Sequence, residues 1–106
     1  MADSLQGTLD LLILKTLQLG PNHGFGITLH IQTATQGLLR VEEGSLYPAL
    51  HRLERDKLVS AAWKTTDKRR RARVYSLTAA GRKRLGEAEE SWPALAKGVG
   101  RLLRCV

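Results

Sequence analysis

The chain has 106 residues and a formal net charge of +7, with 17 Lys and Arg residues against 10 Asp and Glu residues. This length suggests one domain, and the apolar runs are too short for a transmembrane helix. The first residues, MADSLQGTLDL, lack the charge pattern of a signal peptide, so we expect a cytoplasmic protein with no membrane partner. The single cysteine, Cys105, excludes an internal disulfide and a metal site of clustered cysteines.

Positive charge is concentrated in the second half of the chain. Residues 1–41 are electrically balanced, whereas residues 42–78 carry nine cations against five anions. Within this block, the segment KTTDKRRRAR (64–73) holds six cations and one anion. Such a local field attracts polyanions, nucleic acid first and acidic membrane second. The alternative is a solvated loop that is basic for solubility.

Two helices are predicted at the beginning of the chain. Residues 5–19, LQGTLDLLILKTLQL, repeat apolar side chains at spacings of three and four. Leu11 and Leu14 lie off that stripe, so this helix is apolar on more than one side, and its second side is expected to meet another subunit. The segment GPNHGFG (20–26) breaks the helix, and a second helix covers about residues 24–36.

A third helix, about residues 43–57, has an apolar face and a face suited to contact. A turn of about 100° per residue gathers the leucines on one side and small or polar residues on the other. Small residues allow close approach to bases, hydroxyls can bond phosphates, and His or Arg can donate to either. A solvated face, with Arg52 and Arg55 beside Glu54 and Asp56, is the alternative. The predicted DNA contacts are Gly44, Ser45, Tyr47, Pro48, His51, Arg52 and Arg55.

A β-hairpin with a basic tip follows the third helix. Residues 58–64, LVSAAWK, and 72–78, ARVYSLT, alternate with a period of two, which predicts strands. Residues 65–71 contain no apolar side chain, so this tip should point into solvent, and without Asn-Gly it should be long and mobile. Cations here are expected to contact phosphates or the minor groove. They are Lys64, Lys68, Arg69, Arg70, Arg71 and Arg73.

The last predicted helix begins after Thr78, which is expected to cap it. Apolar residues between Leu85 and Leu102 follow one another at spacings of three and four, a heptad pattern typical of helices that pack against partner helices. Pro93 is expected either to kink this helix or to restart it. The predicted dimer interface consists of Leu11, Leu14, Leu85, Ala88, Trp92, Leu95, Val99 and Leu102.

The order helix, helix, helix, strand, strand, helix is that of a winged helix-turn-helix. The expected fold is mainly α with a small β-hairpin (α+β). Residues 1–78 would form the DNA-binding domain and residues 79–106 the C-terminal dimerisation helix, within a single compact unit. The third helix would read a groove of double-stranded DNA, and the hairpin would be the wing.

Four segments resemble the PadR-like transcriptional regulators and together span about residues 5–90. They are GTLDLLILKTL, GPNHGFGI, GSLYPALHRLE and ARVYSLTAAGRKRL. The resemblance implies a homodimeric repressor of the short-tailed branch, whose C-terminal helix forms the dimer interface and often packs on the partner's first helix. Two positions depart from the family: Phe25 stands where tyrosine is frequent, and Glu42 stands where a Ser or Asn cap is common.

The resemblance also implies a small aromatic effector, because some family members bind phenolic acids or planar cationic drugs between their subunits. Trp92 is the residue that would serve, and plain interface packing is the alternative. His23 and His30 have no second ligand at a chelating spacing, so we expect them to cap a helix or lie at the surface. We expect no cofactor and no metal site.

The sequence therefore predicts a DNA-binding transcriptional regulator, a repressor released by an effector. The alternative is a ligand-sensing or protein-interaction module with little DNA specificity, in which the wing has no role on DNA. RNA binding is a further alternative, because a basic patch does not distinguish RNA from DNA, although no aromatic stacking platform typical of RNA-binding modules is apparent. An enzyme is not expected, because the three histidines, one cysteine and scattered carboxylates form no nucleophile–base pair or metal cluster.

Overall fold

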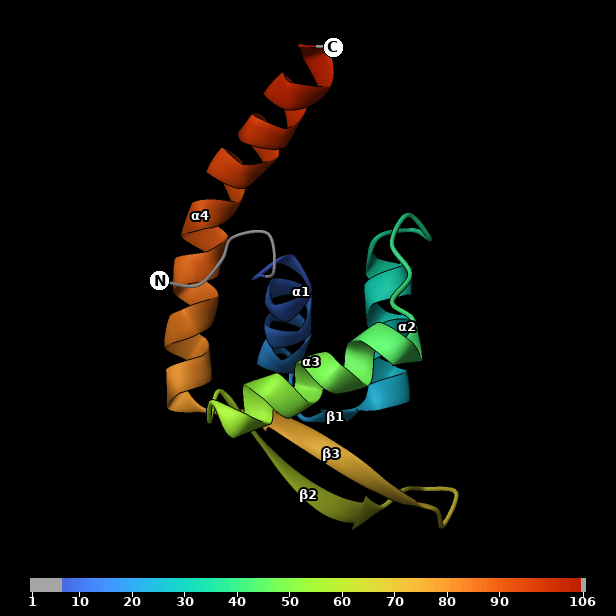
Figure 1. Ribbon diagram of the computed structural model, residues 1–106. Helices are drawn as coiled ribbons and strands as arrows, with labels where there is room; N and C mark the ends of the chain where they lie inside the picture. Colours follow the sequence, from blue (N-terminus) through green and yellow to red (C-terminus); the bar gives the residue numbers. More distant parts are fainter. Residues whose placement is uncertain (1–6, 106) are drawn as a thin grey trace.

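The computed structural model describes residues 7–105, which form four helices and a three-stranded sheet (Figure 1). The predicted α+β class is confirmed. The beginning of the first predicted helix, residues 5 and 6, lies outside the described residues. The elements are α1 (Gly7–Gln18), β1 (Asn22–His23), α2 (Gly24–Ala34), α3 (Glu43–Arg55), β2 (Val59–Thr65), β3 (Arg71–Leu77) and α4 (Ala79–Arg104).

One apolar core joins all four helices to the base of the sheet. The inward face predicted for α3 is confirmed, since its four apolar residues are all buried. Burial of that face leaves the opposite face of α3 uncovered, which matters for the site below. The core residues are Ile13, Leu14, Leu17, Ile27, Ile31, Leu46, Ala49, Leu50, Leu53, Leu58, Val59, Tyr75 and Leu85.

The sheet has one strand more than the sequence predicts. Its order is β1-β3-β2, all antiparallel, and the extra strand β1 pairs Asn22 with Tyr75 and His23 with Val74. Two residues show no period, so the alternation that predicts β2 and β3 cannot reveal β1. His23 also caps α2, because its Nδ1 accepts from the Gly26 N–H at 3.0 Å. The β1 strand therefore fixes the start of α2 against the sheet.

The wing, which comprises β2, β3 and residues 66–70, has a short tip. The Thr66 N–H donates to the Arg70 carbonyl at 2.8 Å, and the Arg69 N–H donates to the Thr66 carbonyl at 2.9 Å. Arg69 has φ 58°, the left-handed conformation that closes a three-residue hairpin loop. The prediction of a long loop is wrong, because arginine occupies the position where glycine would have signalled this turn.

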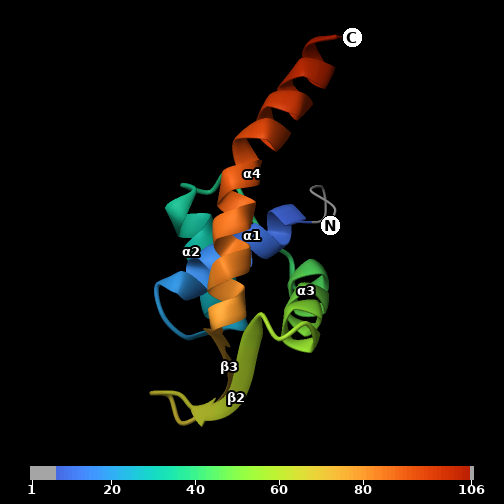
Figure 2. The same cartoon turned by 90° about the vertical axis from the view of Figure 1, so that its left-hand side faces the viewer.

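The beginning of α4 is anchored at the base of the wing. The prediction that Thr78 caps this helix is confirmed, since its Oγ1 accepts from the Gly81 N–H at 3.0 Å. The same hydroxyl lies 2.9 Å from the Leu58 carbonyl, and the Thr78 N–H donates to that carbonyl at 3.2 Å. The helix is continuous across Pro93, and its axis bends near its middle in both views (Figures 1 and 2).

Two residues predicted for the dimer interface belong to the core of the subunit. Leu14 is 0% exposed and Leu85 is 1% exposed, because α1 and the first half of α4 pack against each other. The prediction is therefore wrong for these two side chains. Periodicity identifies apolar faces, but it does not tell a neighbour in the same chain from one in another.

Substitution of Lys57 by glycine is expected to stabilise the protein by about 0.5–1 kcal/mol. Lys57 follows α3 with φ 61°, and the Leu58 N–H donates to the Leu53 carbonyl at 2.9 Å. This is the helix ending in which glycine is preferred, because a side chain is strained in the left-handed conformation. Urea denaturation of both proteins measures the difference, and a less stable variant would contradict the explanation.

Candidate nucleic-acid interface

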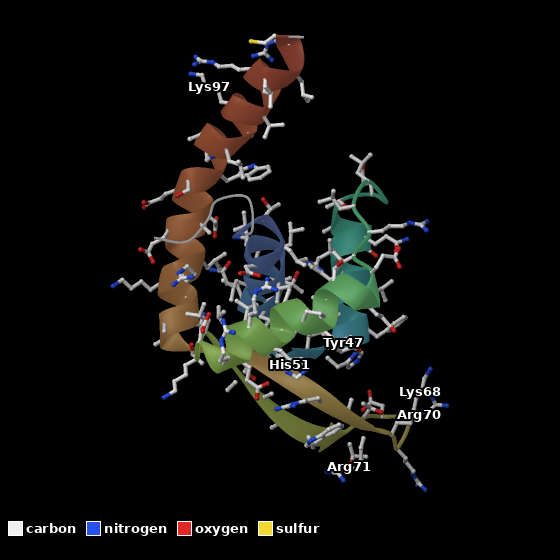
Figure 3. All side chains as sticks on the ribbon, viewed as in Figure 1. Tyr47, His51, Lys68, Arg70, Arg71 and Lys97 are labelled. Atoms are coloured by element: carbon white, nitrogen blue, oxygen red, sulfur yellow. The ribbon has the colours of Figure 1, made fainter. Side chains whose placement is uncertain are left out.

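The uncovered face of α3 presents most of the residues predicted to contact DNA. Gly44, Ser45, Tyr47, Pro48, His51 and Arg55 are all exposed. Tyr47 and His51 lie on the side of the helix that faces the wing (Figure 3). The position of Tyr47 depends on Gly24, because a Cβ built at that glycine would lie 2.7 Å from the Tyr47 Oη. The ring of Tyr47 therefore rests on the first residue of α2.

Pro48 changes the hydrogen bonding on the same face. Proline has no N–H, so the carbonyl of Gly44, four residues earlier, lacks its normal donor in the helix. Both residues are exposed. The exposed face of α3 thus carries a free backbone acceptor in addition to its hydroxyl and imidazole groups, and a base or a water molecule can donate to it.

Arg52 differs from the free cation that the sequence suggests. Its Nη2 lies 2.9 Å from the Asp10 Oδ1 of α1, and its side chain is only partly exposed. The ion pair joins the flank of α3 to α1 across 42 positions of the chain. Arg52 is therefore held in place by α1, whereas His51 and Arg55 extend into solvent.

Asp10 should make stability depend on pH in a direction set by burial. Burial raises the pKa of this carboxyl above its ordinary 3.8, and this effect outweighs the attraction of Arg52, which lowers the pKa. A raised folded-state pKa means that the folded protein holds the proton more tightly than the unfolded chain. The resulting stabilisation is complete below 3.8 and is lost as the pH rises through the folded-state pKa.

The variant Asp10→Asn lacks this titration. We expect the free energy of unfolding of the unsubstituted protein to fall relative to that of Asp10→Asn as the pH rises from below 3.8. Urea denaturation of both proteins at a series of pH values measures this difference. A difference that is constant with pH would show that the ion pair with Arg52 cancels the effect of burial, and a change in the opposite direction would show that the ion pair outweighs it.

The wing is fixed to α3 by a second ion pair. The Arg73 Nη2 lies 2.6 Å from the Glu54 Oε2. Arg73, predicted to contact DNA, is therefore half-buried opposite Trp63 in the middle of the wing instead of free at its tip. Lys68, Arg69, Arg70 and Arg71 are exposed at or beside the tip. The ion pairs of Arg52 with Asp10 and of Arg73 with Glu54 thus hold α3 against α1 on one side and against the wing on the other.

A groove of about 970 Å³ separates α3 and the start of α2 from the wing. Tyr47 and His51 border it on the helical side, and Lys68, Arg70 and Arg71 border it on the wing side (Figure 3). Because neighbouring residues of a strand point to opposite faces, Lys64 lies on the other face of the wing from its neighbour Trp63, which lines the groove. Six of the predicted contacts thus meet around one hollow, and the other seven do not line it: the six are Tyr47, His51, Lys68, Arg70, Arg71 and Arg73.

Several side chains that line this groove were not among the predicted contacts, and three of them carry exposed or partly exposed rings. Phe25 and His23 come from the start of α2 and from β1, and Trp63 comes from the middle of β2. The alternation of β2 could have indicated Trp63, because it lies on the same face as Ala61 and directly opposite Arg73. Nothing in the local sequence brings Phe25 to the wing, since that requires the position of α2 in the fold.

The second half of α4 presents a separate apolar surface. Trp92, Val99 and Leu102 are exposed, and Ala88 and Leu95 are partly exposed. Leu11 of α1 is also partly exposed. Within residues 7–105, no helix is long and apolar enough to span a bilayer, and no three His, Cys, Asp or Glu side chains are grouped to hold a metal ion.

A helix-turn-helix with an uncovered third helix, a cationic hairpin wing and a groove between them defines a winged-helix protein that binds DNA. The sequence profile described as the transcriptional regulator PadR-like family matches residues 13–87. The chain belongs to this family and is a transcriptional regulator, not an enzyme. The resemblance noted from the sequence is thereby confirmed.

Related proteins agree with this assignment. The chain is 42% identical to the transcriptional regulator Rv3488 of Mycobacterium tuberculosis over 77 aligned residues. These residues cover 73% of this chain and 68% of the relative. A transcriptional regulator from Clostridium thermocellum has a similar structure, with a TM-score of 0.80 and 28% identity over 94% of this chain and 97% of that one. A PadR-like regulator from Bacillus cereus gives a TM-score of 0.73 with 26% identity, over 96% and 97% of the two chains.

Proposed function

We propose that this regulator is a repressor that binds operator DNA as a homodimer, with α3 in the major groove and the wing against the adjacent backbone or minor groove. The observation that supports this most is the shared groove, which the exposed face of α3 and the wing cations both border. Groups on α3 can donate to base edges, whereas arginines on the wing hold phosphates and carry little sequence information.

The proposed contacts divide by role. Gly44, Ser45, Tyr47, Pro48, His51 and Arg55 meet bases or phosphates from α3, and Arg52 reaches the duplex from the flank while Asp10 holds it. Lys68, Arg69, Arg70 and Arg71 hold phosphates from the wing tip. Lys64 adds charge from the opposite face of the wing, and Arg73 acts by positioning the wing on Glu54.

The exposed apolar row of α4 supports the homodimer. In water, the uncovered side chains of Trp92, Val99 and Leu102 gain free energy when another apolar surface covers them. Their spacing suits a partner helix, with Leu11 of α1 as a neighbouring contact. Sedimentation equilibrium tests this proposal: Leu102→Asp should shift the protein towards the monomer, and a wild-type monomer at micromolar concentration would refute it.

We further propose that a small planar aromatic effector binds beside Trp92 and releases the DNA. The support is the exposed indole ring on the proposed dimer surface, whose face suits stacking. The variant Trp63→Phe leaves Trp92 as the only tryptophan, so fluorescence quenching by planar aromatics reports on this ring alone. Quenching combined with release of bound duplex supports the role, whereas quenching without any duplex binding favours a ligand-sensing module that does not act on DNA.

Fluorescence anisotropy with DNA from the chain's own promoter tests the central proposal. Binding should weaken as salt rises, and the promoter should be preferred over random duplex at physiological salt. His51→Ala should change the preference among sequences, because its exposed imidazole on α3 can donate to base edges. Equal affinity for promoter and random duplex at every salt concentration would refute a sequence-specific repressor.

A further inference from the structure

Two aromatic side chains without a role in the core border the same groove from opposite sides. Phe25, in the first turn of α2, is 67% exposed, and Trp63, in β2, is 59% exposed. Single exposed apolar residues need no explanation, but two large rings around one hollow, with Tyr47 between α2 and the wing, form a surface. The groove is thus bordered by rings as well as by cations.

Packing does not account for either ring. The inward face of α2 is supplied by Ile27 and Ile31, which are buried, so the core does not need Phe25. On the sheet, Ala61 pairs with the buried Tyr75, whereas Trp63 lies two residues nearer the tip and opposite Arg73. Trp63 is therefore on the face of the wing that turns towards α3, beyond the part of the sheet that the core covers.

The charges around the two rings indicate which kind of molecule the groove binds. Lys68, Arg70 and Arg71 line the groove, and Asp67 is its only carboxylate among the described residues. The guanidinium carbon of Arg71 lies 5.4 Å from the centre of the Trp63 ring, so this cation and this ring form one unit. A basic channel with apolar faces suits the backbone of a DNA strand, because its phosphates can meet the cations while its sugars meet the rings.

We infer that the groove holds the backbone of one strand of the bound duplex, and that Phe25 and Trp63 contact the deoxyriboses of this strand from two sides through non-ionic, apolar contacts. The inference rests on the proposed function and adds two residues to its interface. It also explains why the wing carries a tryptophan beside its arginines. These apolar contacts should strengthen binding without adding to its salt dependence, because the rings displace no counterions.

Alanine substitutions separate these apolar contacts from the ionic contacts. In fluorescence anisotropy with a duplex that the unsubstituted protein binds, Phe25→Ala and Trp63→Ala should each weaken binding by about tenfold, because the apolar area that each ring buries against the strand is lost. The slope of log affinity against log salt should stay unchanged for both. Lys68→Ala, which removes a cation from the same groove, should instead lower that slope by about 0.9. Both rings are exposed, so the variants should fold, and circular dichroism checks this.

Matched variants define what the rings contribute. Leu38→Ala removes an apolar side chain that is 85% exposed but lies in the loop after α2, outside the groove, and it should bind like the unsubstituted protein. Phe25→Tyr and Trp63→Phe keep an aromatic face and should retain affinity to within about threefold. A duplex should also shield the protein's tryptophan emission from acrylamide, and Trp63→Phe should lose most of this shielding.

The outcomes distinguish this inference from the proposed function. If the unsubstituted protein binds duplex and the two alanine variants bind it equally well, the rings have no part in binding and the inference is wrong. A loss of affinity accompanied by the same fall in salt slope as for Lys68→Ala would also refute it, because the effect would then be ionic. If the unsubstituted protein binds no duplex at any salt concentration, the proposed function itself fails.

Discussion

Replacement of Gly81 by alanine is expected to lower the free energy of unfolding by about 3 kcal/mol or more. Gly81 lies in the first turn of α4, where a Cβ would stand 2.1 Å from the Leu58 carbonyl oxygen and 2.8 Å from the Leu77 Cδ1. The first of these atoms belongs to the backbone, so the clash cannot be relieved by a side-chain rotation. The helix has to move away, and the hydrogen bonds of Thr78 to Leu58 move with it.

Gly86 in the same helix supplies the control. Apart from its chain neighbours and the nearby backbone of its own helix, no atom lies within 4 Å of a Cβ built there, so Gly86→Ala should stabilise the protein by up to about 1 kcal/mol through helix propensity alone. Urea denaturation measures the change in the free energy of unfolding for both variants. Gly86→Ala should raise this free energy, whereas Gly81→Ala should lower it because of the close contact with Leu58. If Gly81→Ala also stabilised the protein, α4 would not be docked as closely on Leu58 as the structure indicates.

Replacement of Lys68, Arg69 and Arg70 by alanine should weaken binding to every duplex on the order of 100-fold at moderate salt. These cations extend from the tip of the wing, away from the core and outside the contact between Arg71 and Trp63. If each neutralises one phosphate, their removal lowers the slope of log affinity against log salt by about 2.7. The order of preference among sequences should remain, because phosphates are the same in all of them.

The matched control removes the same charge from the other end of the molecule. Lys97, Arg101 and Arg104 lie in the last turns of α4, far from the wing (Figure 3). Their replacement by alanine should leave the salt slope nearly unchanged, which anisotropy titrations over a salt series can establish. If both triple variants lost affinity equally, binding would follow net charge, and the wing would have no special place in the interface.

The sequence predicts those parts of the fold whose residues repeat with a period. The inward face of α3 and the alternation of β2 and β3 follow from spacing alone, and Thr78 caps α4 as expected. The strand β1 has two residues and therefore no period, and the turn at Arg69 lacks the glycine that would have revealed it. The strand β1 is stabilised by β3, which is distant in the sequence, whereas the turn is closed locally by Thr66 and Arg70.

The candidate site shows the same division. Helical spacing predicts which side of α3 is free, and composition predicts the cationic tip. Whether an arginine is ion-paired or free depends on contacts that are distant in the sequence: Asp10 is 42 positions from Arg52, and Glu54 is 19 positions from Arg73. Phe25 reaches the groove only because α2 begins beside the wing. Spacing also could not decide that Leu14 and Leu85 pack within their own subunit.

The junction at Thr78 connects α4 directly to the base of the wing. A single residue separates the end of β3 from the start of α4, and its hydroxyl and amide both engage Leu58 at the foot of the wing. The 26 residues of the helix extend about 39 Å. Because the first half of α4 also packs on α1, a force on the tail of α4 reaches the hairpin through α1 and through the Thr78 junction together.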